Sequence, residues 1–215
     1  MKILKALSFA VFFVLIQLTG NAQLCTLNCP PNLLIKTDSG QEGAIVIFSA
    51  AGATGECGTV IYSPASGTFF RTGSHSVSAT ASTGEKCFFT ITVTDNEPPV
   101  LSELTLSSAS LWPASNRMKK VSVSYTVTDN AQEVTSVMSV SSNDMASTTI
   151  DWEIINNHMV RLNASRLPNG EPRIYWIAVT STDEAGNKTT RTTSIAVSKT
   201  MTALKPVTGS MGIRN

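Results

Sequence analysis

The sequence predicts an all-β chain, folded as two tandem antiparallel β-sandwiches behind an N-terminal signal peptide. Three observations lead to this fold. Short runs in which β-branched and aromatic residues alternate with Ser and Thr recur between residues 33 and 197. These runs end at Gly, Pro, Asn or Asp, which favour turns. No segment after residue 22 has the apolar period of an amphipathic helix of ordinary length.

Residues 1–22 have the pattern of a secretory signal peptide, with cleavage expected after Ala22. Lys2 and Lys5 accompany an apolar run over residues 6–18, and small or polar residues follow. A membrane-spanning or buried helix is one alternative, but the run is shorter than the roughly 20 residues that a span needs. A lipoprotein anchored at Cys25 is another, disfavoured by Leu24 where a small residue is expected. We therefore expect a secreted or cell-surface protein that does not span the membrane.

The charge of the chain argues against nucleic acid as a partner. The formal net charge is +1, and removal of Lys2 and Lys5 with the signal peptide changes it to −1. A chain without a basic excess has little attraction for phosphate backbones or anionic lipid. Charged residues make up only 14% of the sequence, while Ser and Thr are abundant. This composition is typical of secreted β-proteins whose exposed strand faces carry hydroxyls.

A domain boundary is predicted at Pro98 and Pro99, because proline cannot donate to a strand ladder and forces the preceding residue into an extended conformation. We expect domains over residues 24–98 and 99–198. Residues 199–215 lack an apolar period and are expected to form a flexible tail. The first domain contains short strand-like runs at residues 33–37, 44–48, 59–62, 68–70, 75–81 and 87–94.

The first domain resembles the hyalin-repeat (HYR) domain, an immunoglobulin-like module of extracellular proteins. The resemblance rests on Cys29-Pro30 before an extended run, on the phrase around Cys57, on the hairpin of residues 66–73 and on the strand that begins at Cys87. Residues 81–85 depart from the family, which commonly has an Ala-x-Asp-x-x-Gly-Asn turn there. A ligand role of that missing Asp does not carry over to this chain.

The second domain resembles an immunoglobulin-like unit found beside such repeats in bacterial surface proteins. The resemblance implies an architecture and no activity. Its segments are residues 111–118, an alternating strand over 121–129, Asp151-Trp152, residues 160–164, the strand 173–183, a Gly turn at 183–189 and a last strand over 192–197.

All four cysteines fall in the first domain of a chain that we expect to be exported, which favours two disulfides over free thiols. Three connectivities exist. In a sandwich, the start of the first strand, the loop before the third and the start of the last lie at one end, so we favour Cys29–Cys87 and Cys25–Cys57. Zinc is the alternative, but Cys25-x3-Cys29 has no second close pair to complete a tetrahedral site. No metal or other cofactor is expected.

The residue inventory does not favour catalysis, and no catalytic residue is proposed. His75 and His158 are the two histidines, and neither belongs to a metal-spaced pair or a Gly-x-Ser-x-Gly elbow. Asp151 and Glu153 are the one close carboxylate pair in a strand, and a glycosidase needs its two carboxyls across a substrate cleft. If the protein is an enzyme, the hypothesis that we retain is a hydrolase of unknown type.

Two features point to binding. Trp112, Trp152 and Trp176 are candidate ligand-binding residues, although core packing explains most buried aromatics. Tyr175 and Trp176 are neighbours on a strand, so one should be buried and the other exposed. If Asp95, Asn96 and Glu97 at the domain junction meet Asp129, Asn130, Asp183 or Glu184, their oxygens would suit calcium; the alternative is that these residues only terminate strands.

These observations favour a non-catalytic adhesion or interaction module of the cell surface or extracellular space, with a protein or a glycan as partner. The alternative is a carbohydrate-binding protein that uses exposed aromatics of the second domain. A glycan array distinguishes the two hypotheses, because only the second predicts saccharide binding that is lost when an exposed Trp is replaced.

Overall fold

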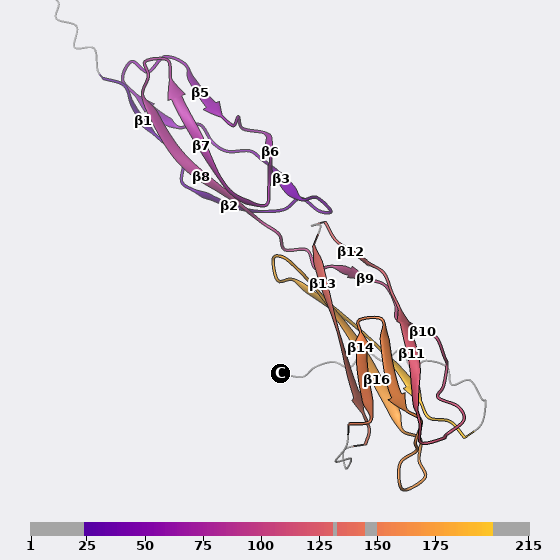
Figure 1. Ribbon diagram of the computed structural model, residues 1–215. Helices are drawn as coiled ribbons and strands as arrows, with labels where there is room; N and C mark the ends of the chain where they lie inside the picture. The colour runs from indigo at the N-terminus through magenta and orange to yellow at the C-terminus, as the bar shows by residue number, and fades with distance from the viewer. Residues whose placement is uncertain (1–23, 131–132, 145–149, 200–215) are drawn as a thin grey trace, which may run out of the picture.

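The computed structural model describes residues 24–130, 133–144 and 150–199, and all of its regular elements are β-strands. Two lobes follow one another along the chain, joined by a short connector (Figure 1). We call residues 24–98 the first unit and residues 99–198 the second unit, as the sequence proposes. The predicted signal peptide and residues 200–215 of the predicted tail lie outside the described residues. The described ranges contain no helix long and apolar enough to cross a membrane.

The first unit contains eight strands: β1 (Thr26–Asn28), β2 (Leu33–Lys36), β3 (Gly43–Val46), β4 (Gly52–Thr54), β5 (Val60–Ser63), β6 (Thr68–Arg71), β7 (Gly73–Ala81) and β8 (Lys86–Thr94). One sheet has the order β2-β8-β7-β5, in which β2 runs parallel to β8 and the other pairs are antiparallel. β3 pairs with β6, and β1 pairs with β4. The three neighbouring strands β5, β7 and β8 match strands C, F and G of an immunoglobulin sandwich, and the pair β3-β6 matches strands B and E.

The core of the first unit lies between these two sheets. Alternation along β8 buries Phe89, Ile91 and Val93, and these side chains meet Ala44 and Val46 of β3. Phe48 packs edge-on against Phe89, with ring centroids 5.0 Å apart. Every second residue of β8 points inward, because successive side chains of a strand point to opposite faces. The apolar residues that alternate in the sequence of β8 are therefore the ones that fill the core.

The second unit contains β9 (Val100–Leu101), β10 (Thr105–Leu106), β11 (Met118–Ser124), β12 (Val127–Thr128), β13 (Val134–Ser142), β14 (Trp152–Asn156), β15 (Met159–Asn163), β16 (Ile174–Asp183) and β17 (Lys188–Ala196). Its sheets have the orders β10-β11-β15-β14 and β13-β16-β17, and β9 pairs with β12. These orders are the A–B–E–D and C–F–G sheets of a constant-type immunoglobulin domain. The protein is thus two tandem immunoglobulin-like β-sandwiches.

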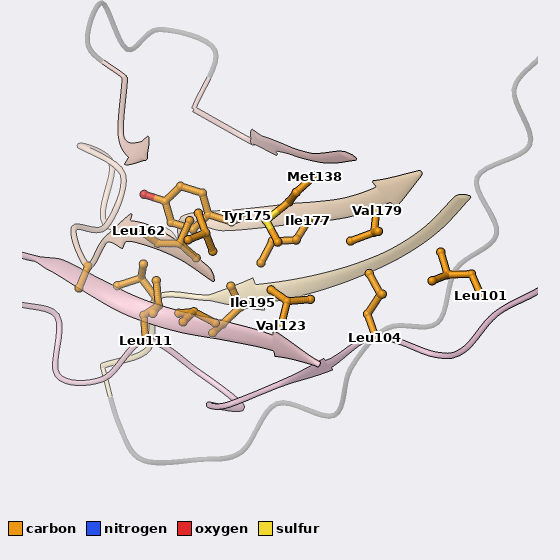
Figure 2. Close-up of a cluster of buried hydrophobic side chains, with 14 residues drawn as sticks. Leu101, Leu104, Leu111, Val123, Met138, Leu162, Tyr175, Ile177, Val179 and Ile195 are labelled. Atoms are coloured by element: carbon orange, nitrogen blue, oxygen red, sulfur yellow. The ribbon is translucent and has the colours of Figure 1, made fainter. Parts of the chain in front are cut away.

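A larger core lies between the sheets of the second unit. Figure 2 shows side chains of both sheets meeting there, among them Val123 and Leu162 from one sheet and Tyr175, Ile177 and Val179 from the other. These five residues are at most 1% exposed. Burial of this many large apolar side chains is the main favourable contribution to folding that the second unit has.

Three features of the strands differ from the sequence prediction. The single strand expected over residues 121–129 is two strands, because β11 pairs with β15 whereas Val127 and Thr128 pair with β9. The Gly-rich stretch at residues 51–58 contains β4, which pairs with β1. β13, an edge strand that pairs with β16, was not predicted at all. In each case a partner distant in the sequence determines the strand, which local pattern cannot show.

Candidate functional site

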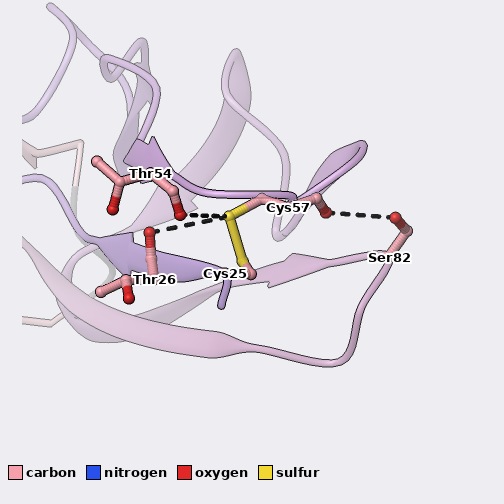
Figure 3. Close-up of a disulfide and its surroundings, with 5 residues drawn as sticks. All are labelled: Cys25, Thr26, Thr54, Cys57 and Ser82. Carbon is pink, nitrogen blue, oxygen red and sulfur yellow. Dashed lines mark hydrogen bonds between the residues drawn. A yellow bond between two sulfur atoms is a disulfide. The ribbon is translucent and has the colours of Figure 1, made fainter. Parts of the chain in front are cut away.

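The structure joins Cys25 to Cys57 and Cys29 to Cys87, the two pairs favoured from the sequence, and the described residues contain no free cysteine. Figure 3 shows the Cys25–Cys57 bridge beside β1 and β4, where Cys57 Sγ lies 3.3 Å from the carbonyl oxygen of Thr54. Ser82 Oγ donates to the carbonyl oxygen of Cys57 at 3.3 Å. Cys25 and Cys57 are buried with Ala81 in a small cluster apart from the main core. The bridge therefore stabilises an end of the unit that has few apolar contacts.

The three candidate tryptophans lie in different environments. Trp112 is 41% exposed, and Trp176 of β16 is 39% exposed. Trp152 of β14 packs against the core, with its ring edge-on to Tyr175 at a centroid distance of 6.4 Å. Tyr175 is fully buried while its neighbour Trp176 is exposed, as strand alternation requires. Two of the three tryptophans are thus accessible to a ligand, and Trp152 has a packing role.

Asp151 and Glu153, the carboxylate pair noted in the sequence, belong to different ion pairs. Asp151 and Asp144 both pair with Arg173, whose Nη2 lies 2.7 Å from Asp144 Oδ2, and all three side chains are buried. Glu153 pairs with Arg161 at the surface, at 2.9 Å. Asp151 and Glu153 thus have different cationic partners and do not form one carboxylate pair.

Tyr175 connects the Arg173 network to the core. Its hydroxyl donates to the carbonyl oxygen of Asn163 at 2.9 Å and lies 3.3 Å from that of Asp151. Burial raises the pKa of Tyr175 above its usual value of 10.0, because the phenolate would lose its hydration. The phenol therefore stays protonated in the folded protein and holds the two carbonyl groups together.

The two histidines make structural contacts. His75 Nε2 lies 2.8 Å from the carbonyl oxygen of Arg71, and its ring meets Phe70 edge-on. His158 stacks on Tyr125, with ring centroids 4.4 Å apart, beside a hollow of about 480 Å³. The hollow is lined by Tyr125, Val127, Val134, Ser136, Asn156, Asn157 and His158. The lining contains one serine hydroxyl, and Ser136 Oγ is bonded to Ser181 Oγ at 2.8 Å, whereas His158 Nδ1 lies 3.2 Å from the carbonyl oxygen of Val123. In the described part of the chain, Ser136 and His158 therefore do not form the hydrogen-bonded nucleophile and base of covalent catalysis.

The outward faces of the two C–F–G sheets are poor in charge. On the first outer face, Leu34, Ile61 and Phe88 are 65–73% exposed, among the hydroxyls of Ser76, Ser78, Thr80, Thr90 and Thr92. On the second outer face, Val137 and Trp176 are exposed among Ser139, Ser141, Thr180, Thr190, Thr192 and Ser194. Hydroxyl pairs cross both sheets, as between Thr180 and Thr190 at 2.8 Å. The sequence predicted the hydroxyls and named Trp176 as a candidate, but it did not locate the exposed apolar side chains of Leu34, Ile61, Phe88 and Val137.

At the junction the structure brings together Asp95, Asp129 and Asp183, each offering an oxygen within 4.8 Å of the others. Asn130 donates from Nδ2 to Asp95 Oδ1 at 3.0 Å and to the carbonyl oxygen of Gln41 at 2.9 Å. Asn96 and Glu184 are exposed outside the group. Glu97 instead accepts from the amide of Gly40 at 2.9 Å.

The chain matches no family model and no curated protein. Several solved structures of extracellular domains match it at low identity. One is the N-terminal eight Ig domains of Down Syndrome Cell Adhesion Molecule, with a TM-score of 0.39, 9% identity and coverage of 80% of this chain and 24% of that one. Extracellular domains 3–5 of Drosophila OTK give a TM-score of 0.38, 12% identity and coverage of 80% and 61%. Human mucin-like protocadherin EC1-2 gives a TM-score of 0.33 and 12% identity, with coverage of 81% of this chain and 97% of that one. This chain thus spans less than two thirds of the first two.

Proposed function

We propose that the protein is a secreted or cell-surface adhesion module without catalytic chemistry, which binds a partner through the outer faces of its C–F–G sheets. The observation that carries this proposal is the composition of those faces. Phe88 and Trp176 project from hydroxyl-rich sheet surfaces with few charges. The cores of protein interfaces are depleted of charge and enriched in aromatic residues, which supply most of the binding energy.

The extracellular location is inferred from the disulfides, from the export signal and from the resemblance of the two units. Two disulfides in one small unit are typical of proteins that fold in an oxidising environment. The apolar segment and Ala22 at the N-terminus have the pattern of an export signal. The resemblance of residues 24–98 to the HYR domain agrees with an extracellular module, and that of the second unit with a bacterial surface protein.

Cell binding tests the proposal. Labelled full-length chain is added to the cells that produce it, and the bound amount is measured by flow cytometry. Replacing the two projecting aromatics in the double variant Phe88→Ser/Trp176→Ser should weaken binding by about tenfold or more, as for the loss of hot-spot side chains.

The matched control is Ile45→Ser/Ile154→Ser, which replaces exposed apolar residues of β3 and β14 on the opposite sheets. This control should bind like the wild type. Equal binding by wild type and the aromatic double variant would contradict the proposal, as would an equal loss in both double variants.

The carbohydrate-binding alternative is favoured by one observation, the exposure of Trp112 and Trp176. Indole rings stack on the apolar faces of sugars, so an exposed Trp is a suitable platform. On a glycan array this alternative predicts saccharide binding that is abolished by Trp112→Ala or by Trp176→Ala. Trp152→Ala should reduce this binding only as far as it destabilises the fold. The adhesion proposal is favoured if the array shows no binding and if treating the cells with protease removes cell binding.

A further inference from the structure

The acidic group at the junction draws oxygens from three separate segments. Asp95 follows β8, Asp129 follows β12, and Asp183 is the last residue of β16. Asp183 is only 6% exposed. The ion pairs formed by the described residues involve other carboxylates, and neither Asp95 nor Asp183 has a cationic partner among them. Carboxylates this close repel one another more strongly as their exposure to water falls.

Two buried oxygens at the same place have no hydrogen-bond partner. Asp95 Oδ2 and Asn130 Oδ1 each have less than 1 Å² of exposed surface and accept no hydrogen bond in the described part of the chain. The orientation of the Asn130 amide is determined, because Nδ2 donates to Asp95 Oδ1 and to Gln41 O. Its Oδ1 is therefore the atom left without a donor. Buried polar atoms in proteins are nearly always satisfied, and a bound ion is one of the few explanations for those that are not.

The other oxygens of the group are already held in place. Asp95 Oδ1 accepts from Thr37 Oγ1, the amide of Glu97 and Asn130 Nδ2. Asp183 accepts from the amide and side chain of Asn187, both at 2.8 Å. The carboxylates of Asp95 and Asp183 are thus oriented before any ligand arrives. Preorganised ligands lose little conformational freedom on binding, which favours affinity.

The donor set selects the ion. Carboxylate and amide oxygens are hard ligands, and no His or Cys belongs to the group. Zinc prefers nitrogen and sulfur, and magnesium requires near-ideal octahedral geometry at shorter distances. Calcium takes six to eight oxygens in irregular arrangements and completes its shell with water. Oxygens contributed from the ends of three separate strands, rather than by one regular element, fit calcium best.

We propose that Asp95, Asp129 and Asp183, together with Asn130 Oδ1, bind one calcium ion that joins the end of the first unit to the second unit. Asp95 directly follows β8 of the first unit, whereas Asp129 and Asn130 follow β12 and Asp183 ends β16 of the second unit. Gln41 of the first unit already accepts a hydrogen bond from Asn130, and Asp95 O accepts one from Asn187 Nδ2 at 3.4 Å. The ion would add ionic ligation to these few neutral bonds. Its removal should let the angle between the units vary.

Titration calorimetry on the full chain tests the site. Wild type should bind one calcium ion with a Kd of about 0.1–1 mM, the range of extracellular modules, and magnesium should not compete at equal concentration. Asp95→Asn should weaken calcium binding by about tenfold or more, because it removes an ionic ligand. The matched control is Glu184→Gln, which removes an exposed carboxylate adjacent to Asp183 and should bind as wild type does.

A second variant and a second measurement guard against misfolding. Asp129→Asn should weaken binding as Asp95→Asn does, and each variant should keep the circular dichroism spectrum of the wild type. In small-angle X-ray scattering, calcium should also narrow the range of radii of gyration that the wild-type chain adopts. The same addition of calcium should leave the range for Asp95→Asn unchanged. The proposal is overturned if wild type shows neither heat of binding nor a shift in melting temperature at about 10 mM calcium. This concentration is well above the dissociation constants of the weakest extracellular calcium-binding modules. It is also overturned if folded Asp95→Asn and Asp129→Asn bind as tightly as wild type.

Discussion

The two units have the same sandwich plan but are stabilised in different ways. Among the described residues, the main core of the first unit contains eight buried hydrophobic residues, and that of the second contains fourteen. Both disulfides lie in the first unit, and the second has no cysteine. Small domains bury too little apolar surface to be stable easily, and cross-links that restrict the unfolded chain offset this. The same fold is thus reached with covalent constraint in one unit and with apolar burial in the other.

The largest effect is expected from the longer disulfide. Cys29→Ala/Cys87→Ala opens a loop with a sequence separation of 58 residues. On the chain-entropy model this lowers the free energy of unfolding of the first unit by about 4 kcal/mol. Urea unfolding of the variant should show this loss in the first unit only. The Cys25→Ala/Cys57→Ala pair, with a separation of 32, should cost about 0.5 kcal/mol less. A change in the second unit would mean that the units are coupled.

Matched truncations in the two cores come next. Ile91 and Ile177 are both fully buried, on β8 and β16. Replacing either by Ala should cost about 3 kcal/mol through lost burial and the remaining cavity. Each should lower the melting temperature of its own unit in differential scanning calorimetry. Under reducing conditions Ile91→Ala should leave the first unit unfolded, while the second unit of Ile177→Ala should melt at the same temperature with and without reductant. Equal sensitivity to reductant would argue against the proposed difference.

Removing the Tyr175 hydroxyl should cost about 1 kcal/mol at neutral pH, because Asn163 O loses a buried donor. The pH dependence has a definite sign. The pKa of Tyr175 is raised on folding, so its stabilising effect is complete below the unfolded value of about 10 and is lost as the pH rises above it. Urea unfolding at about pH 9 and pH 11 should show a steeper loss for wild type than for Tyr175→Phe. Parallel losses would show that another group is responsible.

Trp176→Ala should have the smallest effect on stability, within about 0.5 kcal/mol, because the ring projects from the second outer face. Trp152→Ala is the comparison, since its ring packs on Tyr175 and its loss should cost more. Thermal unfolding of the two variants measures the difference. If Trp176→Ala is the more destabilising, its ring has a packing role and the second outer face is not a free surface.

Local pattern was sufficient where a strand carries its own alternation. β8 and β16 were predicted because their inward residues are large and apolar, and the disulfide pairs followed from sandwich topology. β13 was missed because polar Ser136 and Ser142 occupy two of its inward positions. The break between β11 and β12 depends on pairing with β9, which no local signal specifies.

The junction was predicted in part for a related reason. Asp95, Asp129 and Asp183 each end a strand, and the topology places those ends together. Sequence could not exclude Glu97 and Glu184, because one residue along a turn changes the direction of a side chain. It also could not identify Asn130 Oδ1 as a buried acceptor without a donor, since that depends on the bonds made by its Nδ2.

We infer that covalent constraint stabilises the first unit and that apolar burial stabilises the second. Differential scanning calorimetry of the wild-type chain in calcium-free buffer, with and without a phosphine reductant, separates these two contributions. Ile177→Ala identifies the transition of the second unit. We expect reductant to lower or abolish the first unit's transition while the second unit's melting temperature stays unchanged. Two transitions that fall together, or a first transition that resists complete reduction, would contradict the claim.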